Sequence, residues 1–160
     1  MKTQLEAARA AYEREGYFIS EQPVVPAEVV AGALRGMDEV RAGRYDTGTP
    51  PQPSVWKPGD DPAKLCKIEM PQIADQAIWK LVSHPALGEL AASLTGAQWV
   101  QVWWVQLLYK PPSQPSASTN VGWHQDRHYW KVWEEGSELF TAWVALDEVR
   151  AESEIGRAHV

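Results

Sequence analysis

The sequence contains a single cysteine, Cys66, so it cannot close an intrachain disulfide. A disulfide-rich secreted domain is therefore excluded, and one thiol fits a reducing compartment such as the cytoplasm. The sequence also lacks a run of the ~18 apolar residues that a membrane-spanning helix needs. The N-terminal stretch Met1-Lys2-Thr3-Gln4-Leu5-Glu6 has no apolar signal-peptide core. We therefore expect a cytoplasmic protein with no membrane partner.

Positive charge is also scarce. The chain has 15 Lys and Arg against 21 Asp and Glu, which gives a net charge of −6, and no basic cluster occurs. Nucleic acid and anionic membranes bind clustered basic residues, so neither is expected as a partner. A length of 160 residues with 44% hydrophobic content suits one domain with its own core. Nothing in the composition indicates the oligomeric state.

The first part of the chain predicts helices. Apolar residues recur at helical spacing in the segments 5–12, 29–40, 73–81 and 87–94. Gly16, Gly43 and Gly96 are placed to end three of these helices, and Pro26 suits the first turn of the second. His84, just before a proline, is interpreted as a helix cap.

The rest of the chain predicts a loop and strands. Residues 44–62 contain five prolines and two glycines, which favour a loop and a lid over a cleft. Short apolar or alternating runs predict strands at 17–19, 66–70, 98–109, 121–126 and 138–146. Nine tryptophans, six of them after residue 100, are interpreted either as pocket-lining residues or as core and interface packing.

The tripeptide His124-Gln125-Asp126 carries the clearest chemical signal. On a strand, the side chains of His124 and Asp126 lie on one side because side chains alternate, so both can bind one ion. Iron held by two histidines and one carboxylate keeps three positions open, which an oxygenase needs for a co-substrate and dioxygen. The second histidine must come from elsewhere in the chain.

Three segments that include this tripeptide resemble the phytanoyl-CoA dioxygenase family of Fe(II)- and 2-oxoglutarate-dependent oxygenases. They are Leu108-Tyr109-Lys110-Pro111-Pro112, the run from Trp123 to Trp130, and the run from Thr141 to Asp147. The resemblance extends from Glu15-Gly16-Tyr17 to about Glu152. It implies an α+β, mostly β fold: a double-stranded β-helix (jelly-roll, cupin-like) core, incomplete here, buttressed by the N-terminal helices.

The resemblance also implies a site and a reaction. His124 and Asp126 are expected to bind Fe(II), with 2-oxoglutarate as co-substrate and O2 as oxidant. The residues expected to bind 2-oxoglutarate are Lys67, Gln106, Gln125 and Trp143. The reaction would be hydroxylation of an unactivated C–H bond of a small molecule whose identity the sequence does not specify. Two alternatives stay open: a jelly-roll metal enzyme that does not use 2-oxoglutarate, and a non-catalytic small-molecule binding module.

Several of these residues have plainer interpretations. Lys67 is interpreted equally as a solvated lysine on the polar side of its strand, and Trp143 more readily as a core residue than as a ligand contact. His128 follows His124 at the spacing of helical zinc ligands, but Gln125 stands where a zinc protease has glutamate. We therefore interpret His128 as a structural partner or a pocket-lining donor.

The C-terminal part of the sequence departs from the pattern of the family that it resembles. In the family, the distal His and the Arg that binds 2-oxoglutarate lie many tens of residues beyond the His-X-Asp tripeptide, whereas this sequence ends at Val160. Residues 154–160 match no family pattern and are what a common sequencing adapter encodes. We expect residues 1–153 to be the N-terminal part of a single domain and 154–160 to be a non-native tail. His159 is therefore not assigned, and we expect this chain to bind iron weakly and to be inactive.

Overall fold

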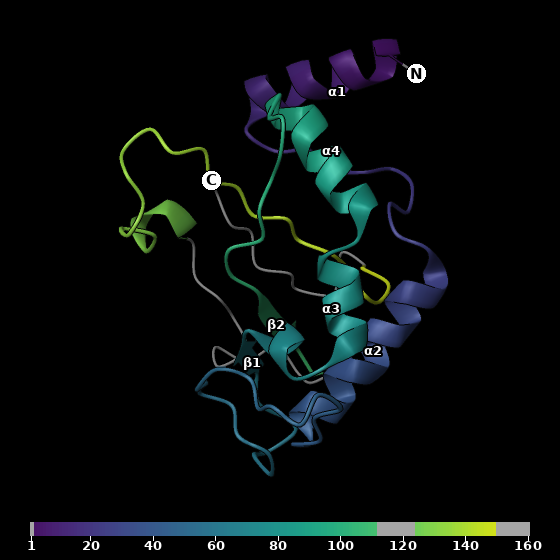
Figure 1. Ribbon diagram of the computed structural model, residues 1–160, viewed down its shortest axis with the longest axis vertical. Coiled ribbons are helices and arrows are strands. Elements are labelled where there is room, and N and C mark those ends of the chain that lie inside the picture. Colours follow the sequence, from purple (N-terminus) through teal and green to yellow (C-terminus); the bar gives the residue numbers. More distant parts are fainter. Residues whose placement is uncertain (1, 112–123, 150–160) are drawn as a thin grey trace. The chain divides into compact units, whose positions relative to one another are not determined.

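The computed structural model describes residues 2–111 and 124–149 (Figure 1). Residues 20–111 form one compact unit. Residues 2–19 and 124–149 belong to a second unit. The expected tail at 154–160, His159 and Trp123 lie outside the described residues.

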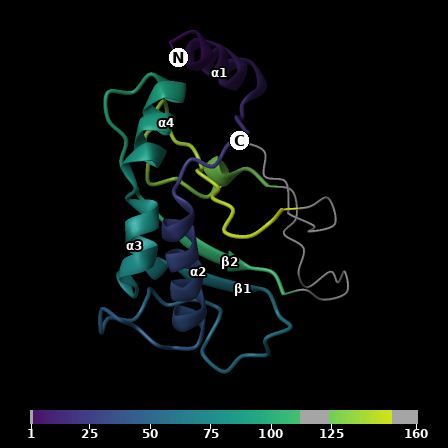
Figure 2. The same cartoon turned by 90° about the vertical axis from the view of Figure 1, so that its right-hand side faces the viewer.

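The core of the 20–111 unit forms between two helices, α2 (Ala27–Arg41) and α3 (Gln76–Val82), which pack against each other (Figures 1 and 2). The apolar stripe predicted for α2 is confirmed, because its four members are buried: Val29, Ala33, Met37 and Val40. Ile78 and Leu81 are buried on α3. Pro26 is the N-cap of α2 and not a first-turn residue, because its ψ of 142° is extended.

A two-stranded antiparallel sheet completes this unit. Strand β1 (Cys66–Glu69) pairs with β2 (Gln106–Tyr109), so that Cys66 lies opposite Tyr109 and Glu69 opposite Gln106. The alternation predicted for 66–70 is confirmed, since Cys66 and Ile68 are buried while Lys67 between them is half-buried. One face of the sheet therefore belongs to the core, and the other is polar.

Two further helices end where the sequence predicts. Helix α4 (Pro85–Thr95) begins after His84, whose Nδ1 accepts a hydrogen bond from the backbone N–H of Ala86 at 3.3 Å. It ends at Gly96, which adopts a φ of 75° that favours glycine. In the other unit, helix α1 (Lys2–Glu15) ends at Gly16, with a φ of 77°.

The long strand predicted for 98–109 is wrong in extent, because only β2 forms. The reason lies in its partner. Met70, directly after β1, has a left-handed φ of 53°, and Pro71 then begins the short 3₁₀ helix η1 (Pro71–Ile73). The backbone N–H of Met70 still donates a hydrogen bond to the carbonyl of Val105 (2.8 Å), but the chain then turns away from β2. The residues before Val105 therefore have no neighbouring strand among the described residues with which to pair.

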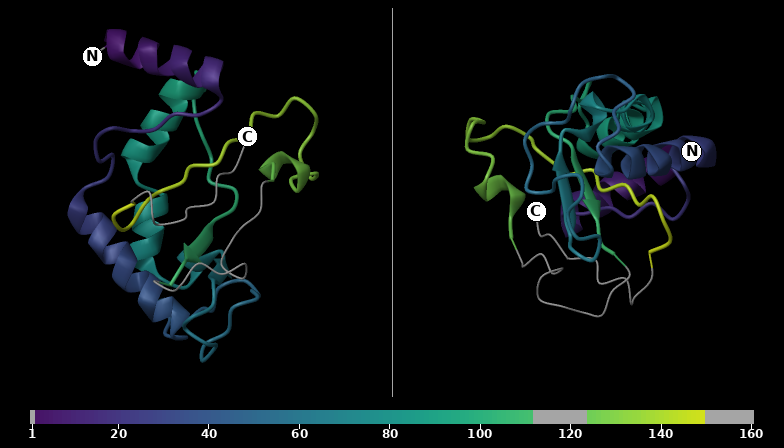
Figure 3. Two further views of the ribbon diagram at one scale, coloured as in Figure 1. Left: turned by 180° about the vertical axis from the view of Figure 1, so that it is seen from behind. Right: turned by 90° about the horizontal axis from the view of Figure 1, so that it is seen from below.

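Three other predicted strands are also corrected. Residues 17–19 are irregular, with Tyr17 and Ile19 exposed, and residues 138–146 are irregular although their sequence alternates. Within 121–126, the described part ends in the 3₁₀ helix η3 (Asp126–His128). A strand needs a paired neighbour, and the only paired strands among the described residues are β1 and β2. The jelly roll is therefore not confirmed within residues 2–111 and 124–149, which Figures 1 and 3 draw in colour.

The tryptophans that the structure describes do not form the core. None of those in the described ranges is buried, and Trp79, Trp99 and Trp143 are each more than half exposed. Core packing is thus the wrong interpretation for these side chains. No helix within residues 2–111 and 124–149 is long and apolar enough to span a membrane.

Candidate metal and co-substrate site

His124 and Asp126 meet at the start of η3. The Nε2 atom of His124 lies 3.3 Å from Oδ1 of Asp126, and about a quarter of each side chain is exposed. The other carboxylate oxygen, Oδ2, accepts a hydrogen bond of 2.6 Å from the hydroxyl of Thr141. The strand predicted for these residues is absent, but their side chains nevertheless lie together.

The surrounding loop is held by local contacts. The Arg127 guanidinium donates hydrogen bonds to the carbonyl oxygens of Glu134 (2.9 Å) and Ser137 (2.8 Å), which tie the segment that follows back to η3. The ring of Tyr129 stands edge-on to that of His124, with the centroids 6.4 Å apart. These contacts restrict the positions of both candidate ligands.

This pair suits one edge of an octahedral metal site. Ligand atoms about 2.1 Å from a metal lie about 3 Å apart when they occupy neighbouring octahedral positions, which matches the observed 3.3 Å. Within residues 2–111 and 124–149, no group of three His, Cys, Asp or Glu side chains could hold an ion. His128 is in a 3₁₀ turn with His124 outside it, so the helical i, i+4 arrangement of zinc ligands does not form.

The 20–111 unit carries a second polar cluster on the exposed face of the sheet, which we call the Glu69 cluster: Lys67, Glu69, Trp104 and Gln106. The Oε1 atom of Glu69 lies 3.2 Å from Lys67 Nζ and accepts a hydrogen bond of 3.2 Å from Gln106 Nε2. Its Oε2 atom accepts a bond of 2.6 Å from the indole N–H of Trp104. The two expected co-substrate residues of this unit, Lys67 and Gln106, are thus joined by one carboxylate.

The opposite face of the sheet is closed by Arg41 at the end of α2. Its guanidinium carbon lies 3.5 Å from the centroid of the Tyr109 ring, in cation–π geometry. Cys66 is fully buried in this region, and burial raises the pKa of its thiol to about 11, against a smaller lowering by Arg41. This face is largely buried in the core, and the Glu69 cluster lies on the opposite, polar face.

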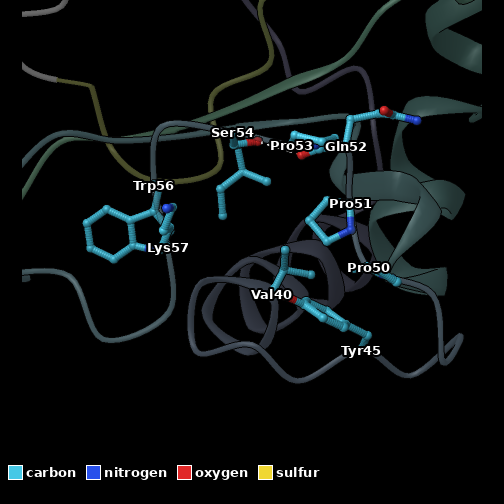
Figure 4. Close-up of a pocket in the computed structure, with 10 residues that line it drawn as sticks. Val40, Tyr45, Pro50, Pro51, Gln52, Pro53, Ser54, Trp56 and Lys57 are labelled. Atoms are coloured by element: carbon cyan, nitrogen blue, oxygen red, sulfur yellow. Dashed lines mark hydrogen bonds between the residues drawn. The ribbon is translucent and has the colours of Figure 1, made fainter.

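The proline-rich loop, residues 44–62, lies against the same sheet. It borders a hollow of about 240 Å³ that Val40 and Ile68 also line (Figure 4). Two contacts anchor the loop to Glu69: the backbone N–H of Gln52 donates to its carbonyl at 3.1 Å, and Ser54 Oγ accepts from its N–H at 2.8 Å. The interpretation of residues 44–62 as a lid stays a prediction.

The remaining predicted residues, Gln125 and Trp143, belong to the same unit as the His124 and Asp126 pair. Gln125 is exposed and is the N-cap of η3. Trp143 is 56% exposed and follows Thr141 by two residues. Both belong to the unit of residues 124–149, whereas Lys67 and Gln106 belong to the other unit. A single cavity shared by all of these residues stays a prediction.

Three residues of these clusters were not identified from the sequence: Glu69, Trp104 and Thr141. Glu69 shares the polar face of β1 with Lys67, which the alternation of the strand indicates, but its position opposite Gln106 depends on the pairing register. Thr141 lies fifteen residues from Asp126, and no local pattern joins them.

Comparison with known protein families identifies the family of this chain. The family model for Phytanoyl-CoA dioxygenase (PhyH) matches residues 12–153. No curated protein and no solved structure matches the chain. Because the match spans most of the sequence, the chain belongs to the phytanoyl-CoA dioxygenase family. Membership indicates an oxidoreductase of the dioxygenase type and implies a cupin-like fold.

Proposed function

We propose that this protein is an Fe(II)- and 2-oxoglutarate-dependent dioxygenase that hydroxylates an unactivated C–H bond of a small molecule. The observation that carries the proposal is the pairing of His124 with Asp126 at 3.3 Å in a chain of this family. An imidazole and a carboxylate are two of the three protein ligands in the iron site of such oxygenases. The third ligand is not assigned among the described residues.

In this proposal His124 and Asp126 bind the metal, and Thr141 positions Asp126. The Thr141 hydroxyl occupies Oδ2 of the carboxylate and leaves Oδ1 facing His124. Hydrogen bonds of this kind orient a ligand and tune its basicity. When bound, iron with 2-oxoglutarate and O2 supplies the oxidising chemistry, in which the co-substrate becomes succinate and carbon dioxide and the substrate gains a hydroxyl group.

The proposed role of the other unit is to bind co-substrate. Lys67 is a cation and Gln106 an amide donor, and both already contact a carboxylate, that of Glu69. These are the donor types that recognise the carboxylate of an oxo acid. We also propose Gln125 and Trp143 as co-substrate contacts, on the family resemblance of their positions. The partner is thus a small molecule, and its class stays open.

The test is metal-dependent succinate formation by the full-length protein with Fe(II), ascorbate and 2-oxoglutarate. His124→Ala and Asp126→Asn should each reduce turnover to background, because each removes a ligand. Glu135→Gln is the matched control, since it removes one exposed carboxylate from the same unit and should leave turnover unchanged.

Two outcomes would decide against the proposal. Turnover that persists in His124→Ala would place the metal elsewhere. Metal binding that depends on His124 and Asp126 but is accompanied by no consumption of 2-oxoglutarate would favour the metal enzyme that does not use this co-substrate.

A further inference from the structure

Glu69 occupies the donors that we assign to the co-substrate. Its Oε1 atom lies 3.2 Å from both Lys67 Nζ and Gln106 Nε2, and Trp104 donates to its Oε2. Three donors from both strands and the segment before β2 thus converge on one carboxylate. The arrangement has the chemistry of a carboxylate-binding site, with a side chain of the protein as the bound group.

The charge balance follows from this contact. Lys67 contributes one positive charge and Glu69 one negative charge, so the pair has no net charge. A second carboxylate that approaches Lys67 is attracted by the ammonium and repelled by Glu69 at similar distances. A ligand carboxylate therefore binds Lys67 well only when the Glu69 side chain leaves.

The structure allows the side chain to leave while the backbone stays. The backbone of Glu69 is held by its pairing with Gln106 and by Gln52 and Ser54 of the proline-rich loop. Its side chain is 20% exposed and that of Lys67 is 43% exposed, so both reach solvent. Rotation of the Glu69 side chain into water breaks three partly exposed contacts, and hydrogen bonds to water replace them.

We infer that Glu69 is an internal competitor for 2-oxoglutarate. Its carboxylate occupies Lys67 and Gln106 when no co-substrate is bound, and a carboxylate of 2-oxoglutarate displaces it from these donors. This inference rests on the proposed function, because it takes Lys67 and Gln106 as co-substrate ligands. Glu69 thereby sets the concentration of 2-oxoglutarate at which the site fills.

The test compares 2-oxoglutarate binding to the full chain and to its Glu69→Gln variant by equilibrium dialysis. The amide keeps the size of the side chain and one acceptor oxygen but removes the charge. The dissociation constant should fall roughly three- to tenfold, a modest change because both charges reach solvent, which screens them. In Glu69→Gln/Lys67→Met this gain should disappear. Glu89→Gln on α4 removes the same charge from an exposed position and should change nothing.

A second measurement follows displacement in the unmodified protein. The indole N–H of Trp104 loses its acceptor when Glu69 leaves, so its NMR signal, assigned with Trp104→Phe, should shift on addition of 2-oxoglutarate. An unchanged signal at saturating 2-oxoglutarate would overturn the inference. Weaker binding by Glu69→Gln would also overturn it, because Glu69 would then position Lys67 for the ligand.

The inference and the proposed function fail in different ways. If succinate forms in a His124-dependent reaction while Glu69→Gln leaves the affinity for 2-oxoglutarate unchanged, the inference fails and the proposed function stands. If Glu69→Gln binds 2-oxoglutarate more tightly but no variant forms succinate, the carboxylate competition stands and the proposed reaction fails.

Discussion

Cys66 shows how burial changes the chemistry of a single residue. The side chain has no solvent exposure, and its desolvation raises the pKa of the thiol from 9.0 to about 11. The nearby Arg41 guanidinium favours the thiolate and opposes this shift only in part. Because the thiolate is the reactive form of cysteine, the folded protein keeps its only thiol inert near neutral pH.

We predict that folding stability decreases as the pH rises from about 9 to about 11. In this range the thiol of the unfolded chain loses its proton while the folded protein retains it, so the unfolded state binds fewer protons and is favoured. Urea unfolding at several pH values measures the effect. Cys66→Ala should show a smaller decrease over the same range, although other groups that titrate there contribute equally to both proteins. Rapid labelling of Cys66 by a thiol reagent at pH 8 without denaturant would contradict the buried position.

At the scale of elements, the contact between α2 and α3 depends on a residue without a side chain. A Cβ atom added at Gly36 would lie 2.3 Å from Oδ1 of Asp75, far inside van der Waals contact. Asp75 cannot move away without cost, because it is buried and the same Oδ1 accepts the hydrogen bond from Ile78 N–H that caps α3. Close packing and helix capping therefore compete for the same space.

We predict that Gly36→Ala lowers the free energy of unfolding by about 1–3 kcal/mol, the usual cost of overpacking a core. Gly32→Ala is the matched control in the same helix, since its added Cβ would lie 3.6 Å from Ala77 Cβ, an ordinary contact. This control should be neutral or stabilising by up to about 1 kcal/mol, because alanine has the higher helix propensity. Equal effects of the two substitutions in urea denaturation would mean that helix propensity, and not the Asp75 contact, decides.

At the scale of the whole molecule, metal binding should be linked to folding stability. A ligand that binds only the folded state stabilises it by roughly 2.7 kcal/mol at a concentration of 100 times its dissociation constant. Mn²⁺, an air-stable substitute for Fe(II), should therefore raise the melting temperature of the full-length protein. Asp126→Asn should lose this increase.

The same measurement examines Thr141, which contacts Asp126 Oδ2. Thr141→Val keeps the shape of the side chain and removes the hydroxyl, so we predict metal affinity about 10- to 100-fold weaker, as for other outer-shell partners. The smaller thermal shift should be recovered at correspondingly higher Mn²⁺. If Thr141→Val shows the full shift at every concentration, the hydroxyl does not support the ligand.

Much of the helical part of this protein could be predicted because its signals are local. The stripe from Val29 to Val40 has the helical period, and the glycines at 16, 43 and 96 adopt the positive φ that ends a helix. The alternation around Lys67 likewise identified β1 and its two faces. The family could also be recognised from the sequence, because the match to residues 12–153 contains the segments that carried the resemblance.

The extent of pairing was decided by tertiary structure. An alternating pattern states which side chains share a face, but a strand forms only where a neighbouring chain supplies hydrogen bonds. Met70 turns β1 aside, and residues 98–105 consequently remain irregular despite their pattern. The same dependence on distant partners limited the prediction of the Glu69 cluster.

By itself, the sequence determined the family, the helices, the polar face that carries Lys67, and the closeness of His124 and Asp126 along the chain. Tertiary structure alone decided which carboxylate meets Lys67 and Gln106, and which hydroxyl supports Asp126. The physical reason is distance along the chain. Periodicity and spacing report on neighbours within a few residues, whereas Glu69 with Gln106, and Asp126 with Thr141, meet only after the backbone has folded.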